Sequence, residues 1–391
     1  MPAPLLLDLS HTCHTQARTG IQRVTRSLAL TLGSNAHTVT HDPFRKLWRQ
    51  LEPWEEANLG TTAPTSKRGA KWPLTALVRG RVGHWLGSSA PLPENSGVLV
   101  PEVFSPVVAA ALPKLFAATR GPRVALFHDA IALKLPELSP PKTVARFPAY
   151  LTELLAFDGI AAVSADSREA LIDYWRWLGV GRTPLVETIP LGVDSLPKGA
   201  TPSTPIRPVV LCVGSIEGRK NHLALLEACE TLWAGGADFT LHLIGLTHLE
   251  TGAKARARLE ALRNSGRPIR YDGPVDDATV EAAYAGCSFS VYPSLMEGFG
   301  LPIIESLRHG KPCLCSGSGA LGESGLGGGC VLLGRVDAPT LATAILTLLA
   351  DVNRLASLSA AARKRRFRSW QEYTDVLVSW MHELQPAVRF R

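Results

Sequence analysis

The sequence predicts an α/β protein of two domains, each a parallel sheet with helices on both faces. Strand-like apolar runs alternate with helix-like segments along the chain. The 391 residues exceed the length at which a single hydrophobic core usually stops growing. A stretch at 195–208 that is rich in Pro, Ser, Thr and Gly has no periodicity, and the alternation restarts after it. We therefore predict a linker there.

The first domain is predicted over 1–194. Short apolar runs predict its strands, at 4–10, 96–103, 123–130, 159–167 and 185–193. Helical spacing predicts two helices, at 19–32 and 167–179. Because ligands bind beyond the carboxyl ends of parallel strands, the cleft between two such domains is the expected active site.

The second domain is predicted over 209–365 by the same alternation. Its predicted strands are 209–215, 239–245, 269–275 and 288–294. Its predicted helices are 221–236, 277–287 and 302–310. Residues 366–391 form a further helical segment, for which a return to the first domain is one arrangement.

Composition narrows the class of protein. Hydrophobic residues at 46% and charged residues at 19% are typical of globular proteins, and no apolar run reaches the roughly 18 residues of a membrane-spanning helix. The apolar stretch 4–10 lacks a basic leader, so we interpret it as a buried strand rather than a signal peptide. Seven scattered cysteines favour a reducing compartment, and Cys313, Cys315 and Cys330 match no common zinc pattern. We predict a cytoplasmic protein without a metal site.

Residues 44–90 interrupt the alternation. This segment holds four of the nine tryptophans, and eight Lys or Arg against three acids. Tryptophans interleaved with cations suit a membrane interface with acidic lipid, which would place the protein at the inner face of the cytoplasmic membrane. The alternative is an irregular cap whose tryptophans pack on the domain. A nucleic-acid partner is not expected, because no recognised binding motif accompanies the net charge of +7.

The stretch "MEGFGLPIIES" carries the first candidate site. Gly298 and Gly300 allow a sharp turn with exposed amides, and Pro302 suits the first turn of a helix. Glu297 would then lie in the turn and Glu305 about one turn into the helix, so that both can face one ligand. Ionised carboxylates only accept hydrogen bonds, which suits a pair that grips two sets of sugar hydroxyls. The alternative is that Glu305 only caps its own helix.

A second candidate site follows the strand at 209–215. Arg219 and Lys220 stand in the turn before a helix opened by Asn221, a good N-cap residue. Adjacent cations at such a turn suit a diphosphate, because Arg binds two phosphate oxygens at once and Lys adds a mobile charge. The first domain would supply Gly20, at a helix start that favours an anion, and His128, at the carboxyl end of a strand.

These motifs together resemble a known family. "EGFGLP" with Glu305 looks like the Glu-x7-Glu signature of the retaining glycosyltransferases of family 4 (group 1), which have two Rossmann-like domains in the GT-B architecture. "GRKN" and "PLGVD" are similar to the same family, so the resemblance covers most of 185–345. The first half matches more loosely, through "TGIQRV" and the position of His128, and 44–90 has no recognised counterpart.

The resemblance implies a role for each matching residue. Glu305 would bind the ribose of a nucleotide-sugar donor, and Glu297 with the amides of Phe299 and Gly300 would hold the transferred sugar. Arg219 and Lys220 would neutralise the leaving diphosphate, Gly20 would approach it from the other domain, and His128 would contact the sugar near the reacting carbon. The donor-binding set implied by the resemblance is completed by Gly214, Gly298 and Leu301.

The resemblance implies a metal-independent hexosyltransferase that retains the anomeric configuration, with front-side attack as the simpler route. No Asp-x-Asp triplet suited to a metal is seen. "TGIQRV" resembles mannosyl- or rhamnosyl-type members, so GDP-mannose is the first donor expected, with a surface glycan or lipid-linked acceptor. Leu191, where Asn is common, and the glycine-rich 316–330 are expected to reshape the sugar pocket.

Three alternatives stay open at this stage. A protein of the same fold could bind nucleotide sugars without turnover, or the basic charge could serve a nucleic acid. A related enzyme of similar fold could instead cleave a glycosidic bond by hydrolysis or phosphorolysis.

Overall fold

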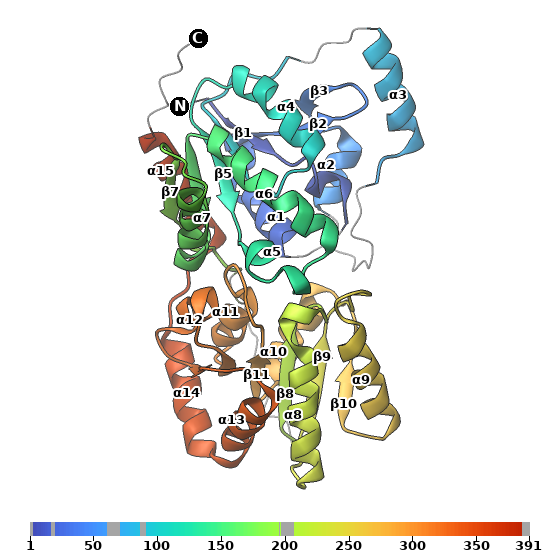
Figure 1. The fold of residues 1–391 in the computed structure, drawn as a ribbon, viewed down its shortest axis with the longest axis vertical. Coiled ribbons are helices and arrows are strands. Elements are labelled where there is room, and N and C mark those ends of the chain that lie inside the picture. The colour runs from blue at the N-terminus through green and yellow to red at the C-terminus, as the bar shows by residue number, and fades with distance from the viewer. Residues whose placement is uncertain are drawn as a thin grey trace.

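The computed structural model describes residues 3–16, 20–60, 71–86, 91–194, 196 and 207–384. Its strands form two separate sheets, each with helices on both faces, and the two stand one above the other in Figure 1. The predicted α/β class with two parallel-sheet domains is confirmed. Nearly all of the predicted linker, 195 and 197–206, lies outside the described residues.

The first sheet has the order β3-β2-β1-β4-β5-β6-β7 and is parallel except for β3, which pairs antiparallel with β2. Its strands are β1 Leu5–Asp8, β2 Ala36–Asp42, β3 Leu47–Gln50, β4 Val98–Val100, β5 Arg123–Phe127, β6 Gly159–Ala162 and β7 Leu185–Thr188. The strand order reverses direction between β1 and β4. Such a switch point leaves a crevice at the carboxyl ends, where ligands bind.

The second sheet has the order β10-β9-β8-β11-β12-β13 and all its strands are parallel. Its strands are β8 Val209–Val213, β9 Thr240–Ile244, β10 Ile269–Tyr271, β11 Phe289–Tyr292, β12 Cys313–Ser316 and β13 Cys330–Leu333. Here the switch point lies between β8 and β11. The loop after β8 carries Arg219 and Lys220, and the loop after β11 carries Glu297, with Glu305 in the helix that follows.

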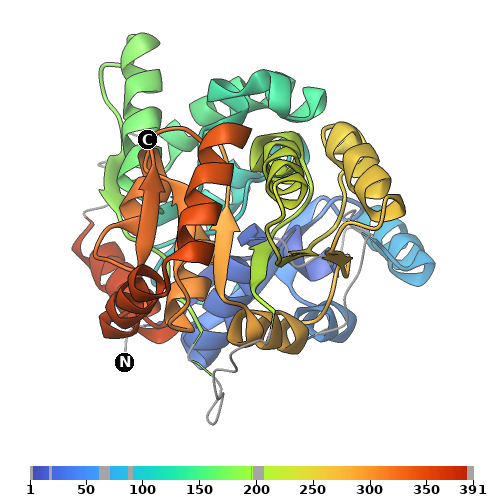
Figure 2. The same ribbon diagram turned by 90° about the horizontal axis from the view of Figure 1, so that it is seen from below.

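Helices cover both faces of each sheet, and the view from below in Figure 2 shows this for the second domain. The helices of the first domain are α1 Gly20–Leu32, α2 Pro53–Leu59, α3 Leu74–Trp85, α4 Pro106–Ala117, α5 Ile131–Lys134, α6 Pro141–Glu153 and α7 Ala165–Trp177. The later helices are α8 His222–Ala234, α9 Ala253–Asn264, α10 Asp277–Gly286, α11 Leu301–Arg308, α12 Gly319–Gly325, α13 Ala338–Ala350, α14 Val352–Lys364 and α15 Trp370–Glu383.

The last helix, α15, packs on the first domain. Its apolar side chains Trp370, Tyr373, Leu377 and Met381 are buried in one core cluster with α1 and β1. Thr374 and Thr31 share a hydrogen bond of 2.6 Å between α15 and α1. The chain enters α15 beside the end of the first domain, where the Val193 amide donates to the Arg368 carbonyl. The two domains are therefore joined by two crossings of the chain.

The segment 44–90 is mostly a cap on the first domain, apart from 61–70 and 87–90, which lie outside the described residues. The expected break in the alternation is wrong at 47–50, because β3 extends the sheet as an edge strand. Trp48 is buried and its Nε1 donates to the Ala111 carbonyl. Trp54 and Trp72 pack around His14. Trp85, in contrast, is exposed.

Within the described residues no single helix is long and apolar enough to cross a bilayer. The pair α13 and α14 passes this test when taken together, by length and composition only, and it is bent by 95° at its junction.

Candidate active site

A cleft of about 490 Å³ lies between the two sheets, at the carboxyl ends of their strands. All eleven predicted site residues line it: Gly20, His128, Gly214, Arg219, Lys220, Glu297, Gly298, Phe299, Gly300, Leu301 and Glu305. The structure thus brings residues that are up to 285 positions apart (305 − 20) around a single cavity. It does not by itself assign their roles.

The predicted turn joins β11 to α11. Gly300 adopts a φ of +103°, the left-handed region that favours glycine, and Pro302 lies in the first turn of α11. Glu305 follows inside the helix and is 4% exposed. From the first domain, α1 begins at Gly20 and directs its N-terminus into the same cleft. Two helix starts therefore border the cavity, and helix N-termini favour an anionic ligand.

Glu297 forms ion pairs with both predicted cations. Its carboxylate lies 2.6 Å from Arg219 Nη1 and 2.7 Å from Lys220 Nζ. Burial by itself would raise the pKa of Glu297, but Lys220 and Arg219 outweigh it and lower that pKa to about 2. Arg219 also contacts Glu217 at 2.8 Å. The loops after β8 and β11 are thus held together by charge.

The turn before α8 differs from the prediction in one respect. Asn221 stands at the N-cap position, but it has a φ of +56° and its side chain makes no cap hydrogen bond. The side-chain amide nitrogen, Nδ2, instead donates to the Val336 carbonyl at 2.7 Å. Asn tolerates the left-handed conformation better than most residues. Asn221 therefore fixes the turn that presents Arg219 and Lys220, although it does not cap the helix.

Arg23 is a site residue that the sequence analysis missed. It extends from α1 across the cleft and pairs with Glu305, and its Nη2 lies 2.7 Å from the carboxylate of Asp194. The Tyr284 hydroxyl donates to the other oxygen of Glu305 at 3.2 Å. The interpretation of Glu305 as a mere helix cap is wrong. The only signal in the sequence was the presence of Arg23 in "TGIQRV".

At Gly298 the backbones of the two domains lie in close contact. A Cβ at this position would lie 2.1 Å from the His128 carbonyl oxygen, so only glycine fits. The Ser167 hydroxyl, at the start of α7, donates to the same carbonyl at 2.9 Å. Behind the loop, the Ser324 hydroxyl donates to the Phe299 carbonyl. The turn therefore rests on the first domain on one side and on α12 on the other.

His128 is buried at the bottom of the cleft. Its Nε2 lies 2.7 Å from the Pro101 carbonyl, which can only accept, so Nε2 carries the hydrogen. Burial lowers the pKa of His128, which favours the neutral ring with Nδ1 as an acceptor. Burial also raises the pKa of the neighbouring Asp129, whose Oδ1 accepts from the Ile131 amide at 3.0 Å.

The described lining of the cleft is not basic. It contains three cations, Arg23, Arg219 and Lys220, against six acids, Asp129, Glu217, Asp277, Glu281, Glu297 and Glu305. The net charge of +7 is therefore carried elsewhere on the molecule. An anion would be held by the placement of individual cations and amides, because no broad positive field is present.

The second half of the chain resembles a known protein family. Residues 207–351 match the family model "Glycosyl transferases group 1". The second domain is therefore similar to group 1 glycosyl transferase domains. The serotype-specific mannosyltransferase WbdA of Escherichia coli is 26% identical over 335 residues, which cover 79% of this chain and 38% of that protein. The O-antigen chain mannosyltransferase B of Escherichia coli is 29% identical over 269 residues, covering 66% of this chain and 69% of that protein.

Solved structures show the same fold. Sucrose-phosphate synthase from Thermosynechococcus elongatus superposes with a TM-score of 0.69 at 20% identity, covering 98% of this chain and 99% of that one. HepE of Anabaena in complex with UDP and glucose superposes with a TM-score of 0.67 at 17% identity, covering 98% and 100%. The GT-B architecture is therefore confirmed, and the matched part of this chain spans 38% of the length of WbdA.

Both departures from the family pattern lie near the cleft. Leu191 is buried and lines the cleft. The glycine-rich segment does not line it; part of this segment forms α12, which packs against α7 of the first domain. Glu323 of α12 accepts from the amides of Ala165 and Asp166 at 2.9 and 2.8 Å. The segment therefore joins the domains and supports the loop from behind.

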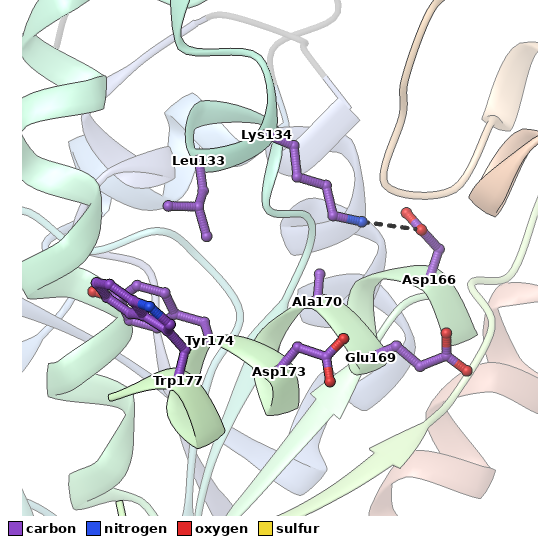
Figure 3. A pocket seen from close by; sticks show the side chains of 8 residues that line it. All are labelled: Leu133, Lys134, Asp166, Glu169, Ala170, Asp173, Tyr174 and Trp177. Atoms are coloured by element: carbon purple, nitrogen blue, oxygen red, sulfur yellow. Dashed lines mark hydrogen bonds and ion pairs between the residues drawn. The ribbon is translucent and has the colours of Figure 1, made fainter. Parts of the chain in front are cut away.

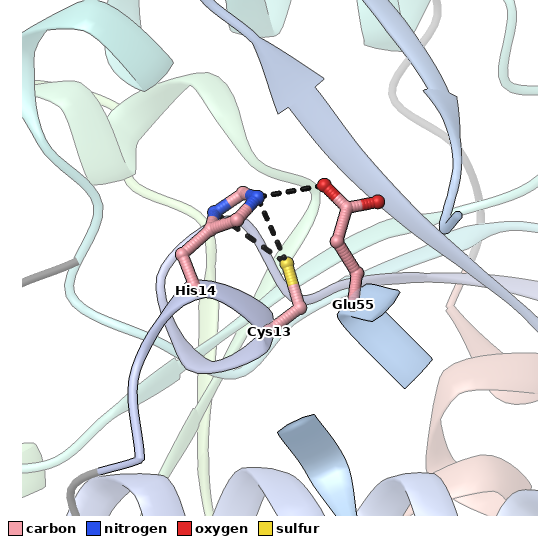
Figure 4. A group of neighbouring side chains, drawn as sticks. All are labelled: Cys13, His14 and Glu55. Carbon is pink, nitrogen blue, oxygen red and sulfur yellow. Dashed lines mark hydrogen bonds and ion pairs between the residues drawn. The ribbon is translucent and has the colours of Figure 1, made fainter. Parts of the chain in front are cut away.

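One cluster among the described residues has the composition of a metal site. Cys13, His14 and Glu55 place a thiol, an imidazole and a carboxylate within 4.8 Å of one another (Figure 4). Glu55 already accepts two hydrogen bonds from Arg49, at 2.6 and 2.8 Å, and His14 Nε2 lies 2.7 Å from it. Burial raises the pKa of the Cys13 thiol well above its usual value. These groups satisfy one another, and we interpret them as the anchor of the cap.

A second hollow, of about 420 Å³, lies in the first domain between α5 and α7 (Figure 3). Tyr174 and Trp177 form one end, with ring centroids 5.9 Å apart, and Trp177 is 78% exposed. The ion pair of Lys134 and Asp166, 3.2 Å long, forms the other end. The α5 helix begins two residues after Asp129, so this hollow lies on the same part of the first domain as the cleft wall.

Replacing Gly298 by Ala should open the cleft. The added Cβ would lie 2.1 Å from a backbone oxygen, so one domain must move away from the other. We expect a larger radius of gyration in small-angle scattering with unchanged circular dichroism. Gly181→Ala is the control, because a Cβ there would meet nothing within 4 Å. Equal radii for the wild type and Gly298→Ala would contradict the close contact.

The ion pairs of Glu297 should appear in the acid dependence of stability. Its pKa is about 2 in the folded state against 4.5 when unperturbed, so its contribution is complete above about pH 4.5 and is lost as the pH falls toward 2. The shift corresponds to about 3 kcal/mol in total. Urea unfolding of the wild type should therefore lose stability more steeply between pH 5 and 3 than that of Glu297→Gln. If the free energies of unfolding of the two proteins fell in parallel with pH, the ion pairs of Glu297 would not contribute to stability.

Proposed function

We propose that this protein is a glycosyltransferase that moves a hexose with retention of the anomeric configuration. The first donor that we propose is GDP-mannose, which would supply mannose. The acceptor is a glycan or a lipid-linked precursor of a surface polysaccharide or lipopolysaccharide. The observation that supports this best is the single cleft that joins a cation pair, a carboxylate pair and two helix starts. The names of the relatives WbdA and O-antigen chain mannosyltransferase B support mannose as the sugar.

The diphosphate binds at Arg219 and Lys220, opposite Gly20. Both cations are paired with Glu297, but an ammonium has three donors and a guanidinium has five. Each can therefore hold the carboxylate and a phosphate oxygen at once. The paired carboxylate also keeps both side chains in place before the donor arrives, which reduces the reorganisation that binding requires.

Glu297 accepts from the hydroxyls of the transferred sugar, together with the amides of Phe299 and Gly300, which donate. Glu305 accepts from the ribose hydroxyls. Its carboxylate already receives hydrogen bonds from Arg23 and Tyr284, and a carboxylate offers about four acceptor positions, so a ribose can be added. Arg23 thereby links the nucleotide site to the first domain, and donor binding would favour the closed arrangement.

The reaction passes through an oxocarbenium-like state at the anomeric carbon. Negative charge grows on the leaving diphosphate, and Arg219, Lys220 and the helix amides stabilise it from fixed positions. The acceptor attacks from the same face, and a phosphate oxygen takes its proton. The neutral His128 ring lies beside the reacting carbon as a hydrogen-bond acceptor. Arg219 and Lys220 neutralise the charge of the diphosphate, so the proposed reaction needs no divalent metal.

The acceptor glycan extends into the hollow between α5 and α7. An exposed indole such as that of Trp177 offers an apolar face on which a sugar ring can stack, and Glu169 and Asp173 offer acceptors for its hydroxyls. A nucleic acid fits this surface and the cleft poorly, because acidic side chains outnumber cations in the described lining of both.

The decisive experiment is a calorimetric titration of GDP, UDP, ADP and dTDP, followed by transfer assays with the matching nucleotide sugars. GDP should bind most tightly without added metal, and GDP-mannose should give an α-linked product, seen by nuclear magnetic resonance. Base-selective binding without transfer would support a binding protein of this fold. Release of free sugar or sugar phosphate would support hydrolysis or phosphorolysis.

Lys220→Ala should weaken GDP and the intact donor alike, by about tenfold or more, because a charge-assisted phosphate contact is lost. Lys364→Ala is the control, since Lys364 is exposed and does not line the cleft. Calorimetry on both ligands measures the effect. An effect on the donor but not on GDP would contradict the diphosphate assignment.

Trp177→Ala should raise the KM for an oligosaccharide acceptor about three- to tenfold and leave donor binding unchanged, because only a stacking surface is lost. Leu178→Ala, at the neighbouring exposed position outside the hollow, should change neither value. Initial rates over a range of acceptor concentrations decide this. An unchanged KM in Trp177→Ala would place the acceptor elsewhere.

A further inference from the structure

The helix α3 exposes its large apolar side chains. Leu74, Val78, Val82, Trp85 and Leu86 are 79%, 63%, 50%, 85% and 67% exposed. Successive residues of an α-helix are about 100° apart, so these five side chains fall within an arc of about 120°. They form one continuous stripe, which we call the α3 apolar face. A shallow groove of about 730 Å³ runs along it.

The opposite side of α3 carries small residues and faces the protein. Ala76 and Gly80 are buried, and a Cβ on Gly80 would lie 2.7 Å from the Cβ of Phe44. A helix that packs on a soluble domain normally buries its large side chains and exposes small or polar ones. In α3 this order is reversed. The close contact at Gly80 fixes this orientation, so the apolar face cannot turn inward without a clash.

Cations border the α3 apolar face on both sides. On the same helical geometry Arg79 and Arg81 lie about 20° beyond either edge of the stripe. Arg79 is 63% exposed and contacts Glu52 at 3.4 Å, and Arg81 is exposed. The stretch 71–86 also contains Lys71 and has no Asp or Glu. An apolar stripe with a terminal Trp and flanking arginines complements an anionic lipid surface.

We propose that the α3 apolar face inserts into the interface of a membrane that contains anionic lipid. The helix lies in the membrane plane, with Leu74, Val78 and Val82 among the acyl chains. Arg79 and Arg81 lie at the level of the phosphates. In Figure 1, α3 stands at the outer edge of the first domain, away from the second domain, so the cleft stays open to donor in solution. This inference concerns a surface remote from the cleft and does not rest on the proposed reaction.

The test is sedimentation of the full chain with phosphatidylcholine vesicles that contain either no anionic lipid or about one third phosphatidylglycerol. The wild type should bind the anionic vesicles and bind the neutral ones much more weakly. Leu74→Ser with Leu86→Ser should reduce the partition coefficient at least tenfold. Leu30→Ser with Leu249→Ser is the matched control, because those leucines are 83% and 78% exposed on other surfaces.

A second variant separates charge from apolar contact. Arg79→Gln with Arg81→Gln should lower binding to anionic vesicles by about fivefold for each arginine and should reduce its dependence on salt. Thermal unfolding should match the wild type for every variant, since all of the replaced side chains are exposed. Failure of the wild type to bind anionic vesicles, or equal loss in the leucine control, would overturn the proposal. A concentration-dependent dimer that the Leu74 and Leu86 double variant abolishes would also overturn it, in favour of an interface between two copies.

Discussion

The cleft between the domains depends on the contact between Gly298 and the carbonyl of His128. The crevices of the two sheets form one shared cleft only if their loops meet. Here the loop backbones of the two domains meet without an intervening side chain. Other interdomain bonds act in the same sense. Arg23 bridges to Glu305, Glu323 caps the start of α7, and α15 returns to pack on α1. Each of these contacts contributes little free energy alone, but together they set the width of the cleft.

Charge inside the cleft is organised locally. Glu297 holds Arg219 and Lys220 in one place, and Arg23 holds Glu305 in another. In a buried setting such pairs cost desolvation, so they are weak evidence for stability. They also hold the charged side chains in fixed positions, and fixed charges stabilise an anion without the cost of reorganisation. The same reasoning explains why a basic protein can have a cleft whose described lining is acidic.

Much of the fold followed from the sequence, but with errors of extent and omission. Predicted strands ran past their true ends: the run at 123–130 stops at Phe127, because the chain then turns and Asp129 accepts from the Ile131 amide. The strands β2, β3, β12 and β13 are not predicted by the sequence. Their short runs gain strand character from pairing with neighbours, and local pattern carries no record of that pairing. The sequence does not decide between a cap and a membrane segment at 44–90 for the same reason, since the hydrogen-bond partner of Trp48, the Ala111 carbonyl, is 63 residues away in the chain.

The sequence alone determined the α/β class, the two domains and the loops that line the cleft, because these depend on periodicity, on glycine and proline at turns, and on charges placed next to strand ends. Only the tertiary structure decided which groups meet. The partnership of Arg23 with Glu305 and the fit of Gly298 against His128 join residues from different domains, and no local rule specifies such contacts. The outward direction of the α3 apolar face was decided in the same way, by the packing of Gly80 on Phe44.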